Sequence, residues 1–394
     1  MFIFSSSKYQ KKNEIKKNYK TKIFFLFFIL LLYFFGFYIR ENIAGGAELD
    51  FKKFTWPAIL SFKENFFNTI INYGTIGEGS LPMFHIINAY LNPFTFEPLF
   101  FQFSISLISL LNVIFFSLVL RLKFRISKID SLLYSSVFLV LPFFRSSAFW
   151  GLTENLGWLF LILAIYFFIK FKSNKNKLIF KNIFLMCMFS SLALYTRPYL
   201  IFFSIFVSLA FLFKKQFKTL LISSSFFIIF SIPGLILFYL WGGSLFMGTG
   251  DQKINFIYEY HHPRFILKNL IFFVSIFFFY LIPFKILEIK SVLKSIDFKF
   301  FVKFILVFLI LFFLLYIGQL DFLTKTKLGG GFFYKLNNLI FENNYIFFIL
   351  ISSLGLVSIL PHLVFSLKNK ILFFSLLSIY CLPKFIYQEY FEPL

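Results

Sequence analysis

The sequence predicts an all-α polytopic membrane protein with about eleven transmembrane helices and a long first extracytoplasmic loop. Hydrophobic residues make up 59% of the chain at a mean hydropathy of +0.82, and charged residues only 14%. A soluble domain of 394 residues would have too little polar surface to cover itself. Apolar runs of about 20 residues, the length that crosses the hydrocarbon core, recur along the chain. We expect one integral membrane domain over residues 1–394.

The apolar runs predict spans whose boundaries follow from hydropathy and flanking charge. The first run ends without a small-residue cleavage site, so we interpret it as a retained helix rather than a signal peptide. The chain stops directly after the last run, which leaves a natural eleven-span protein and a truncated one both open. The predicted spans are 23–40, 96–120, 130–149, 152–170, 182–196, 198–213, 219–241, 266–284, 301–320, 344–366 and 371–388.

The fifth and sixth spans are short and are separated only by Thr196-Arg197-Pro198. Proline disfavours helical geometry in the residue before it, so this sequence predicts a hairpin. One long kinked helix is the alternative, and it would invert the topology of everything downstream.

The basic residues test this threading. With a cytoplasmic N-terminus and the hairpin, the inside segments hold 26 of the 39 basic residues, so the net charge of +22 lies on the cytoplasmic face. The basic residues form short clusters between apolar runs and no single patch, so we expect no nucleic acid partner. Neither GxxxxGK[ST] nor a GxGxxG after a strand occurs, which argues against ATP- or NAD-driven chemistry. The two cysteines lie in apolar runs and imply neither a disulfide framework nor a metal site.

Three sizeable segments then face the exterior: 41–95, 242–265 and 321–343. The first is the most informative, because it carries Glu48 and Asp50 about ten residues beyond the first span. A carboxylate held near the outer membrane surface can act as a general base toward an acceptor hydroxyl. A solvated loop acid is the alternative interpretation.

The rest of this first loop predicts two amphipathic helices in the membrane interface. Aromatic and aliphatic residues recur at helical spacing among lysines over 51–67, and a second helix begins near Pro82. Glu78 and His85 lie beside the second helix and are candidate substrate-binding residues. For His85, a structural role with a satisfied hydrogen bond is the competing interpretation.

Ionisable residues at membrane depth are costly and point either to function or to pairing. Glu154 lies near the outer end of the fourth span, where it either contacts substrate or is neutralised by Arg145. Arg197 lies at an outer turn, where its planar guanidinium suits a phosphate; a helix-end cap is the alternative. In the loop 242–265, His261, His262 and Arg264 are candidates for binding a lipid phosphate. Adjacent histidines alone make a weak metal site, so no metal ligands are assigned and a divalent metal requirement stays open.

This order of segments resembles the membrane glycosyltransferases of the GT-C superfamily. The shared features are the long first outer loop with an early acidic pair, its two interfacial helices, the short hairpin and the large loop after the seventh span. Within the superfamily, the chain is most similar to the dolichyl-phosphate-mannose-transferase-like and aminoarabinose-transferase-like branches. It is more loosely similar to the α-1,2-glucosyltransferases that use dolichyl-phosphate-glucose, whose late aromatic segment is similar to the final YQEYFEPL.

The resemblance implies transfer of a sugar from a polyprenyl-phosphate donor to an extracytoplasmic, lipid-linked acceptor. It implies that an acid of the first outer loop is the catalytic base. Family members carry two adjacent acids there, whereas Leu49 separates Glu48 from Asp50 in this chain, so the resemblance leaves the choice between them open. We prefer Asp50 as the base, with Glu48 as the alternative. It also assigns the carrier phosphate to Arg197 and to the cluster of His261, His262 and Arg264. The polyprenyl-phosphate sugar is the donor substrate, no cofactor is assigned, and a divalent metal requirement stays open. The expected location is the bacterial inner membrane or the endoplasmic reticulum.

Three other classes of protein compete with the transferase. An O-antigen-polymerase-like protein would have its largest loop late in the chain, whereas here the largest comes first. A polysaccharide or lipid flippase would favour a dozen or more regular spans with internal repeats. A structural scaffold explains the spans and leaves the gathering of ionisable groups at their outer ends unexplained.

Overall fold

The computed structural model describes most of the chain as α-helix. The described residues are 19–42, 46–76, 81–173, 179–242, 266–287, 298–317, 336, 339–340 and 346–381. No strand occurs among them, so the predicted all-α class is confirmed for the described chain. The chain divides into two compact units, 1–254 and 255–394, which are described separately below.

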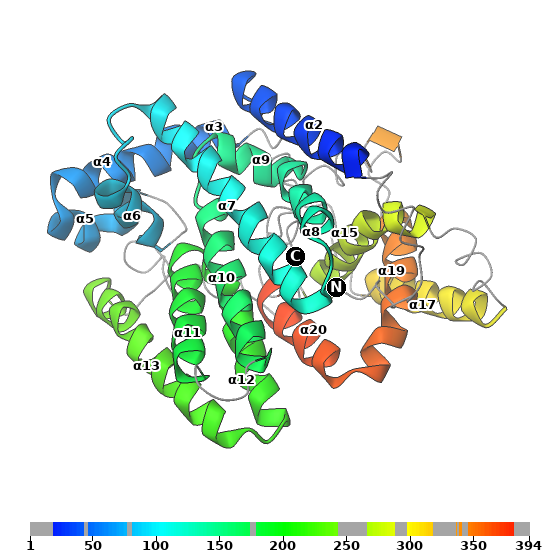
Figure 1. Ribbon diagram of the computed structural model, residues 1–394. Helices are drawn as coiled ribbons and strands as arrows, with labels where there is room; N and C mark the ends of the chain where they lie inside the picture. Colours follow the sequence, from blue (N-terminus) through cyan, green and yellow to red (C-terminus); the bar gives the residue numbers. More distant parts are fainter. Residues whose placement is uncertain are drawn as a thin grey trace. The chain divides into compact units, whose positions relative to one another are not determined.

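Unit 1 contains long bundle helices and a group of short helices between the first two of them (Figure 1). Its long helices and their adjoining turns are α2 (Tyr19–Tyr38), α7 (Pro98–Phe124), α8 (Lys128–Ser135), η3 (Ser136–Leu139), α9 (Pro142–Phe149), α10 (Glu154–Ser173), α11 (Ile179–Thr196), η4 (Pro198–Ile201), α12 (Phe202–Phe213) and α13 (Phe217–Leu240). Its short helices are α3 (Ala47–Asp50), the π-helical turn η1 (Phe51–Thr55), α4 (Trp56–Glu64), α5 (Phe66–Asn72), η2 (Tyr73–Ile76) and α6 (Met83–Leu91).

Five of the described helices are long and apolar enough to cross a bilayer: α2, α7, α10, α11 and α13. The α8–α9 segment adds a sixth candidate, bent by 72° at its break. Helices of this length and composition indicate an integral membrane protein. Shorter apolar helices occupy several of the remaining predicted spans, so the total of eleven stays a prediction.

The inner faces of the central helices are polar in places. On α7, Ser106, Ser109 and Asn112 recur three residues apart and are fully buried. Small polar residues let membrane helices approach closely and hydrogen-bond to one another. Helices α10 and α11 pack side by side next to α7 and complete the centre of this unit (Figure 1).

Helices α11 and α12 form a hairpin. Arg197 between them has an extended backbone, with φ −140° and ψ 110°. Ser190 and Ser204 lie seven residues before and after this turn, and their hydroxyl oxygens are 2.7 Å apart. In a continuous helix the same two residues would be about 21 Å apart. The structure therefore has the predicted hairpin and not the alternative kinked helix.

Contacts between distant segments define two ends of unit 1. At one end, the start of α7 contacts the turn before α10, because a Cβ on Gly151 would lie 2.7 Å from Phe101. We call this end, with the short helices α3–α6, the loop end. At the opposite end, Lys22 at the start of α2 binds Asp130 at the start of α8 with a distance of 2.6 Å. We call that the basic end.

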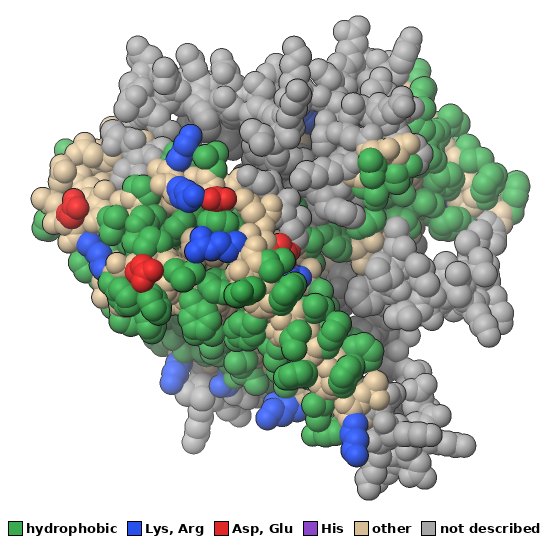
Figure 2. Space-filling model, turned by 90° about the horizontal axis from the view of Figure 1, so that it is seen from above, with side chains coloured by type: hydrophobic (Ala, Val, Ile, Leu, Met, Phe, Trp, Pro, Cys, Tyr) green, Lys and Arg blue, Asp and Glu red, His purple; other side chains and the backbone are tan. Residues whose placement is uncertain are grey.

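The short helices pack against one another and against the end of α13. The predicted interfacial segments form helices α4 and α6, which lie in contact. The indole of Trp241 donates to the Ile70 carbonyl at 2.7 Å and stacks on Tyr73 at a ring distance of 6.1 Å. Figure 2 shows acidic and basic side chains interspersed among apolar ones on the face of unit 1 seen from above.

Unit 2 is also helical, with α15 (Ile266–Leu287), α17 (Phe298–Ile317), α19 (Ile346–Phe365) and α20 (Leu367–Tyr380). Helices α15 and α19 approach closely at Gly355, where a Cβ would lie 2.6 Å from a methyl group of Val274. The Ser275 hydroxyl donates to the Phe348 carbonyl at 3.0 Å across the same interface. A glycine and a serine thus provide the close packing expected between membrane helices.

Candidate functional site

The acidic segment proposed from the sequence forms the short helix α3. Glu48 and Asp50 are two residues apart on a helical turn, so their side chains leave the axis about 200° apart. Glu48 binds Lys52 at 2.5 Å in an exposed i,i+4 pair. Asp50 is exposed, and the Phe51 that follows it is buried. The two acids therefore do not share one face, and Leu49 between them is exposed.

Phe51 connects this acidic segment to the start of α10. Its ring stacks on Phe101 at 6.1 Å with an interplanar angle of 14°. Phe101 in turn lies against Gly151, whose φ of +68° and missing Cβ allow that approach. Glu154 is three residues further along the chain. One ring-to-ring contact and one ring-to-backbone contact thus place α3 and the beginning of α10 at the same end of unit 1.

Glu154 and Arg197 form a buried ion pair at the loop end. Glu154 begins α10 and Arg197 occupies the hairpin turn, and their side chains are 8% and 19% exposed. The two sequence candidates are therefore brought together, as partners of each other. Gly157, one turn into α10, packs against the hairpin turn, because a Cβ there would lie 3.1 Å from the Leu200 side chain, closer than ordinary van der Waals contact.

A hydrogen-bond network holds Glu154 from the other side. The Ser147 hydroxyl donates to Glu154 Oε2 at 2.9 Å and accepts from the Asn155 amide at 2.9 Å. Ser109 of α7 donates to Asn155 Oδ1 at 2.7 Å, and Asn112 donates to the Asn155 carbonyl at 3.0 Å. All of these side chains are buried, so the network fixes the Glu154 carboxylate between α7, α9 and α10.

Arg145 does not pair with Glu154, and this corrects one of the two sequence interpretations. Arg145 binds Glu41, which follows α2, and both side chains are 14% exposed. Gly36 makes the contact possible, because a Cβ there would collide with the Arg145 guanidinium. The Trp150 indole donates to the Glu41 carbonyl at 3.2 Å and closes the contact. Arg145 and Arg197 are thus each paired with a carboxylate that is distant in sequence.

The environment of Glu41 shifts the pKa of its carboxyl group. Burial raises the pKa of the Glu41 carboxyl above its ordinary value, and the Arg145 guanidinium opposes that rise. The opposing effects are those expected of a carboxylate that is withdrawn from water and paired with a cation.

His85 lies in the core of the short helices. It is fully buried, and its Nδ1 lies 2.8 Å from the Tyr73 hydroxyl. Tyr73 also stacks on Trp241, so the histidine belongs to the contacts that join the short helices to α13. This geometry favours the structural interpretation of His85.

The remaining sequence candidates lie outside the described residues: Glu78, His261, His262 and Arg264. Within the described chain, no group of three or more His, Cys, Asp or Glu side chains is arranged to hold a metal ion.

Several residues of the site were not singled out by sequence reasoning. Glu41, Asn155 and Ser109 belong to the buried contacts, and each is a polar residue in or beside an apolar run. On α7 the sequence does contain a pattern that indicates a buried polar face: Ser106, Ser109 and Asn112 recur every three residues and so lie on one side of the helix.

The fold and the buried charges together define a helical integral membrane protein with a polar site at one end of its first unit. No family model matches the sequence, and no significantly similar curated protein or solved structure was found.

Proposed function

We propose that the protein is a GT-C type glycosyltransferase that moves a sugar from a polyprenyl-phosphate donor to an extracytoplasmic, lipid-linked acceptor. The observation that carries the proposal is the placement of α3 at the same end of unit 1 as the Glu154–Arg197 pair. Such an enzyme needs a carboxylate and a phosphate-binding cation on one side of the membrane. The alternating charge of the predicted loops supports an extracytoplasmic position for that end.

In the proposed reaction, the acceptor hydroxyl oxygen attacks the anomeric carbon of the donor sugar. The bond between that carbon and the phosphate oxygen breaks, and its electron pair leaves with the polyprenyl phosphate. Asp50 takes the hydroxyl proton as general base, with Glu48 as the alternative.

Arg197 supplies the charge that the departing phosphate needs. A guanidinium carries five N–H donors, so Arg197 can bind a phosphate oxygen while it stays paired with Glu154. The Ser147–Asn155 network would hold Glu154 in place during this exchange and so keep the hairpin turn in position.

The function is tested by the lipid-linked glycans of a strain that lacks the gene. The transferase predicts that the glycan accumulates short by one sugar and that the wild-type gene restores it. A glycan of normal repeat structure and reduced polymer length would instead assign the protein to the polymerases. Unchanged glycans would overturn the proposal.

A further inference from the structure

The basic end of unit 1 carries a group of exposed cations. We define the basic cluster as Lys20, Arg121, Lys123, Arg125 and Lys128, from the start of α2, the last turn of α7 and the start of α8. All five residues are exposed. Within the part of the chain that the structure describes, none of them is within ion-pair distance of a carboxylate.

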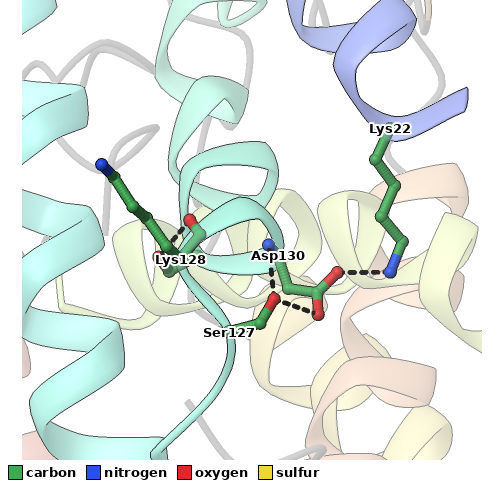
Figure 3. Close-up of polar contacts among 5 residues, drawn as sticks. Lys22, Ser127, Lys128 and Asp130 are labelled. Carbon is green, nitrogen blue, oxygen red and sulfur yellow. Dashed lines mark hydrogen bonds and ion pairs between the residues drawn. The ribbon is translucent and has the colours of Figure 1, made fainter. Parts of the chain in front are cut away.

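The carboxylate nearest in sequence to the cluster, Asp130, is already engaged (Figure 3). Lys22 Nζ donates to Asp130 Oδ1 at 2.6 Å, and the Ser127 hydroxyl donates to Oδ2 at 2.7 Å. Ser127 also caps α8, because its oxygen accepts from the Asp130 backbone N–H at 3.2 Å. Figure 3 shows the Lys128 side chain pointing away from this contact. Asp130 therefore neutralises Lys22, and no carboxylate among the described residues pairs with the cluster.

The same contact brings the cluster together. Lys22 and Asp130 are 108 positions apart, so their bond places the start of α2 beside the start of α8. Arg125 ends α7 in the left-handed conformation, with φ 56°, and its N–H donates to the Arg121 carbonyl at 2.9 Å. That turn leads directly into Ser127, the N-cap of α8. Four of the five cations thus lie within eight consecutive residues around one turn.

An apolar surface adjoins these cations along α2. Phe24, Phe27 and Phe28 are 63%, 62% and 46% exposed and lie one to two turns from Lys20. Phe24 and Phe28 stack at a ring distance of 6.4 Å and form a continuous aromatic face. A ligand that matches both parts has an anionic head and an apolar tail.

We propose that the basic cluster binds the phosphate of an anionic phospholipid, whose acyl chains lie along the exposed phenylalanines of α2. Arginine donates two parallel hydrogen bonds to a phosphate, and each Lys or Arg near an anionic membrane surface strengthens binding by roughly fivefold. This site lies at the opposite end of unit 1 from the proposed transferase site and is independent of that function.

The test compares two charge-matched triple variants of the full chain in lipid nanodiscs. One is Arg121→Gln/Lys123→Gln/Arg125→Gln, and the control is Lys52→Gln/Lys53→Gln/Lys63→Gln in the short helices. Native mass spectrometry measures retained phosphatidylglycerol against phosphatidylcholine. We expect the affinity of the first variant for phosphatidylglycerol to fall on the order of 100-fold. The affinity of the control variant for phosphatidylglycerol should equal that of the wild type, and the weak binding of phosphatidylcholine should be the same in all three proteins. Gel filtration establishes that both variants are folded.

Three outcomes would overturn the proposal. The first is equal retention of phosphatidylglycerol by the wild type and the cluster variant. The second is an equal loss in the control variant, which would reduce the effect to net charge. The third is displacement of the lipid by excess inorganic phosphate, which would assign the cluster to a free anion instead.

Discussion

At the scale of single residues, two largely buried arginines at the loop end of unit 1 each pair with one carboxylate: Arg145 with Glu41 and Arg197 with Glu154. Removing one member of such a pair leaves the other charge buried without a partner, and that loss is larger than the net contribution of the pair itself. Arg197 and Glu154 are the more buried pair, with side chains 19% and 8% exposed.

We expect Glu154→Gln and Arg197→Met each to lower the free energy of unfolding by about 3 kcal/mol. The double variant should lose clearly less than the sum, because neither charge is then left buried alone. Equilibrium unfolding in detergent micelles measures all three.

Glu48→Gln is the matched control for this cycle. It removes the exposed pair with Lys52, whose side chains are 42% and 64% exposed, and should change stability by less than about 1 kcal/mol. Strict additivity of the Glu154 and Arg197 substitutions would contradict the proposed pairing.

The hairpin of α11 and α12 matters most at the scale of elements, because it sets the direction of everything after it. In a background of Cys187→Ser and Cys381→Ser, we expect Ser190→Cys with Ser204→Cys to form a disulfide under mild oxidation. The two hydroxyl oxygens are 2.7 Å apart, which suits the geometry of a disulfide. Mass spectrometry of proteolytic fragments detects the cross-link.

Ser190→Cys with Ser208→Cys is the control for this cross-link. Ser208 lies one turn further along α12, about 6 Å from the position of Ser204, and should not cross-link efficiently. Equal yields from both pairs, or none from the first, would argue against the hairpin.

Local signals in the sequence predicted some elements and missed others for identifiable reasons. Proline after Arg197 marks a helix break from its own stereochemistry, so the hairpin could be predicted without knowing its neighbours. The partner of Arg145 could not be predicted in this way, because Glu41 is 104 positions away and only the packing of α2 on α9 brings the two residues together. Nearness in sequence suggested Glu154 instead, and that pairing was wrong.

At the scale of the whole molecule, charge separates the two ends of unit 1. Basic residues gather at the basic end around Lys22 and Asp130, whereas acids and bases alternate at the loop end. The membrane class of the protein follows from composition alone. The number of spans does not, because apolar helices too short to cross can have the same hydropathy as full spans.

The orientation of unit 1 gives a further prediction. In the same cysteine-free background, Glu97→Cys should react with a membrane-impermeant maleimide on intact cells, and Gln216→Cys should react only after permeabilisation. Glu97 precedes α7 at the loop end, and Gln216 precedes α13 beyond the hairpin. The reverse labelling pattern would place the basic end outside and remove the basis of the proposed extracytoplasmic site.

The most direct test of the proposed transferase is sugar transfer by the purified protein from a radiolabelled polyprenyl-phosphate sugar to a lipid-linked acceptor. We predict that Asp50→Asn lowers the transfer rate by about 100-fold or more, the contribution typical of a general base, while its unfolding curve stays unchanged. Glu64→Gln, which removes another carboxylate of the same loop, should transfer at the wild-type rate. Wild-type rates in both Asp50→Asn and Glu48→Gln would contradict a catalytic base in α3.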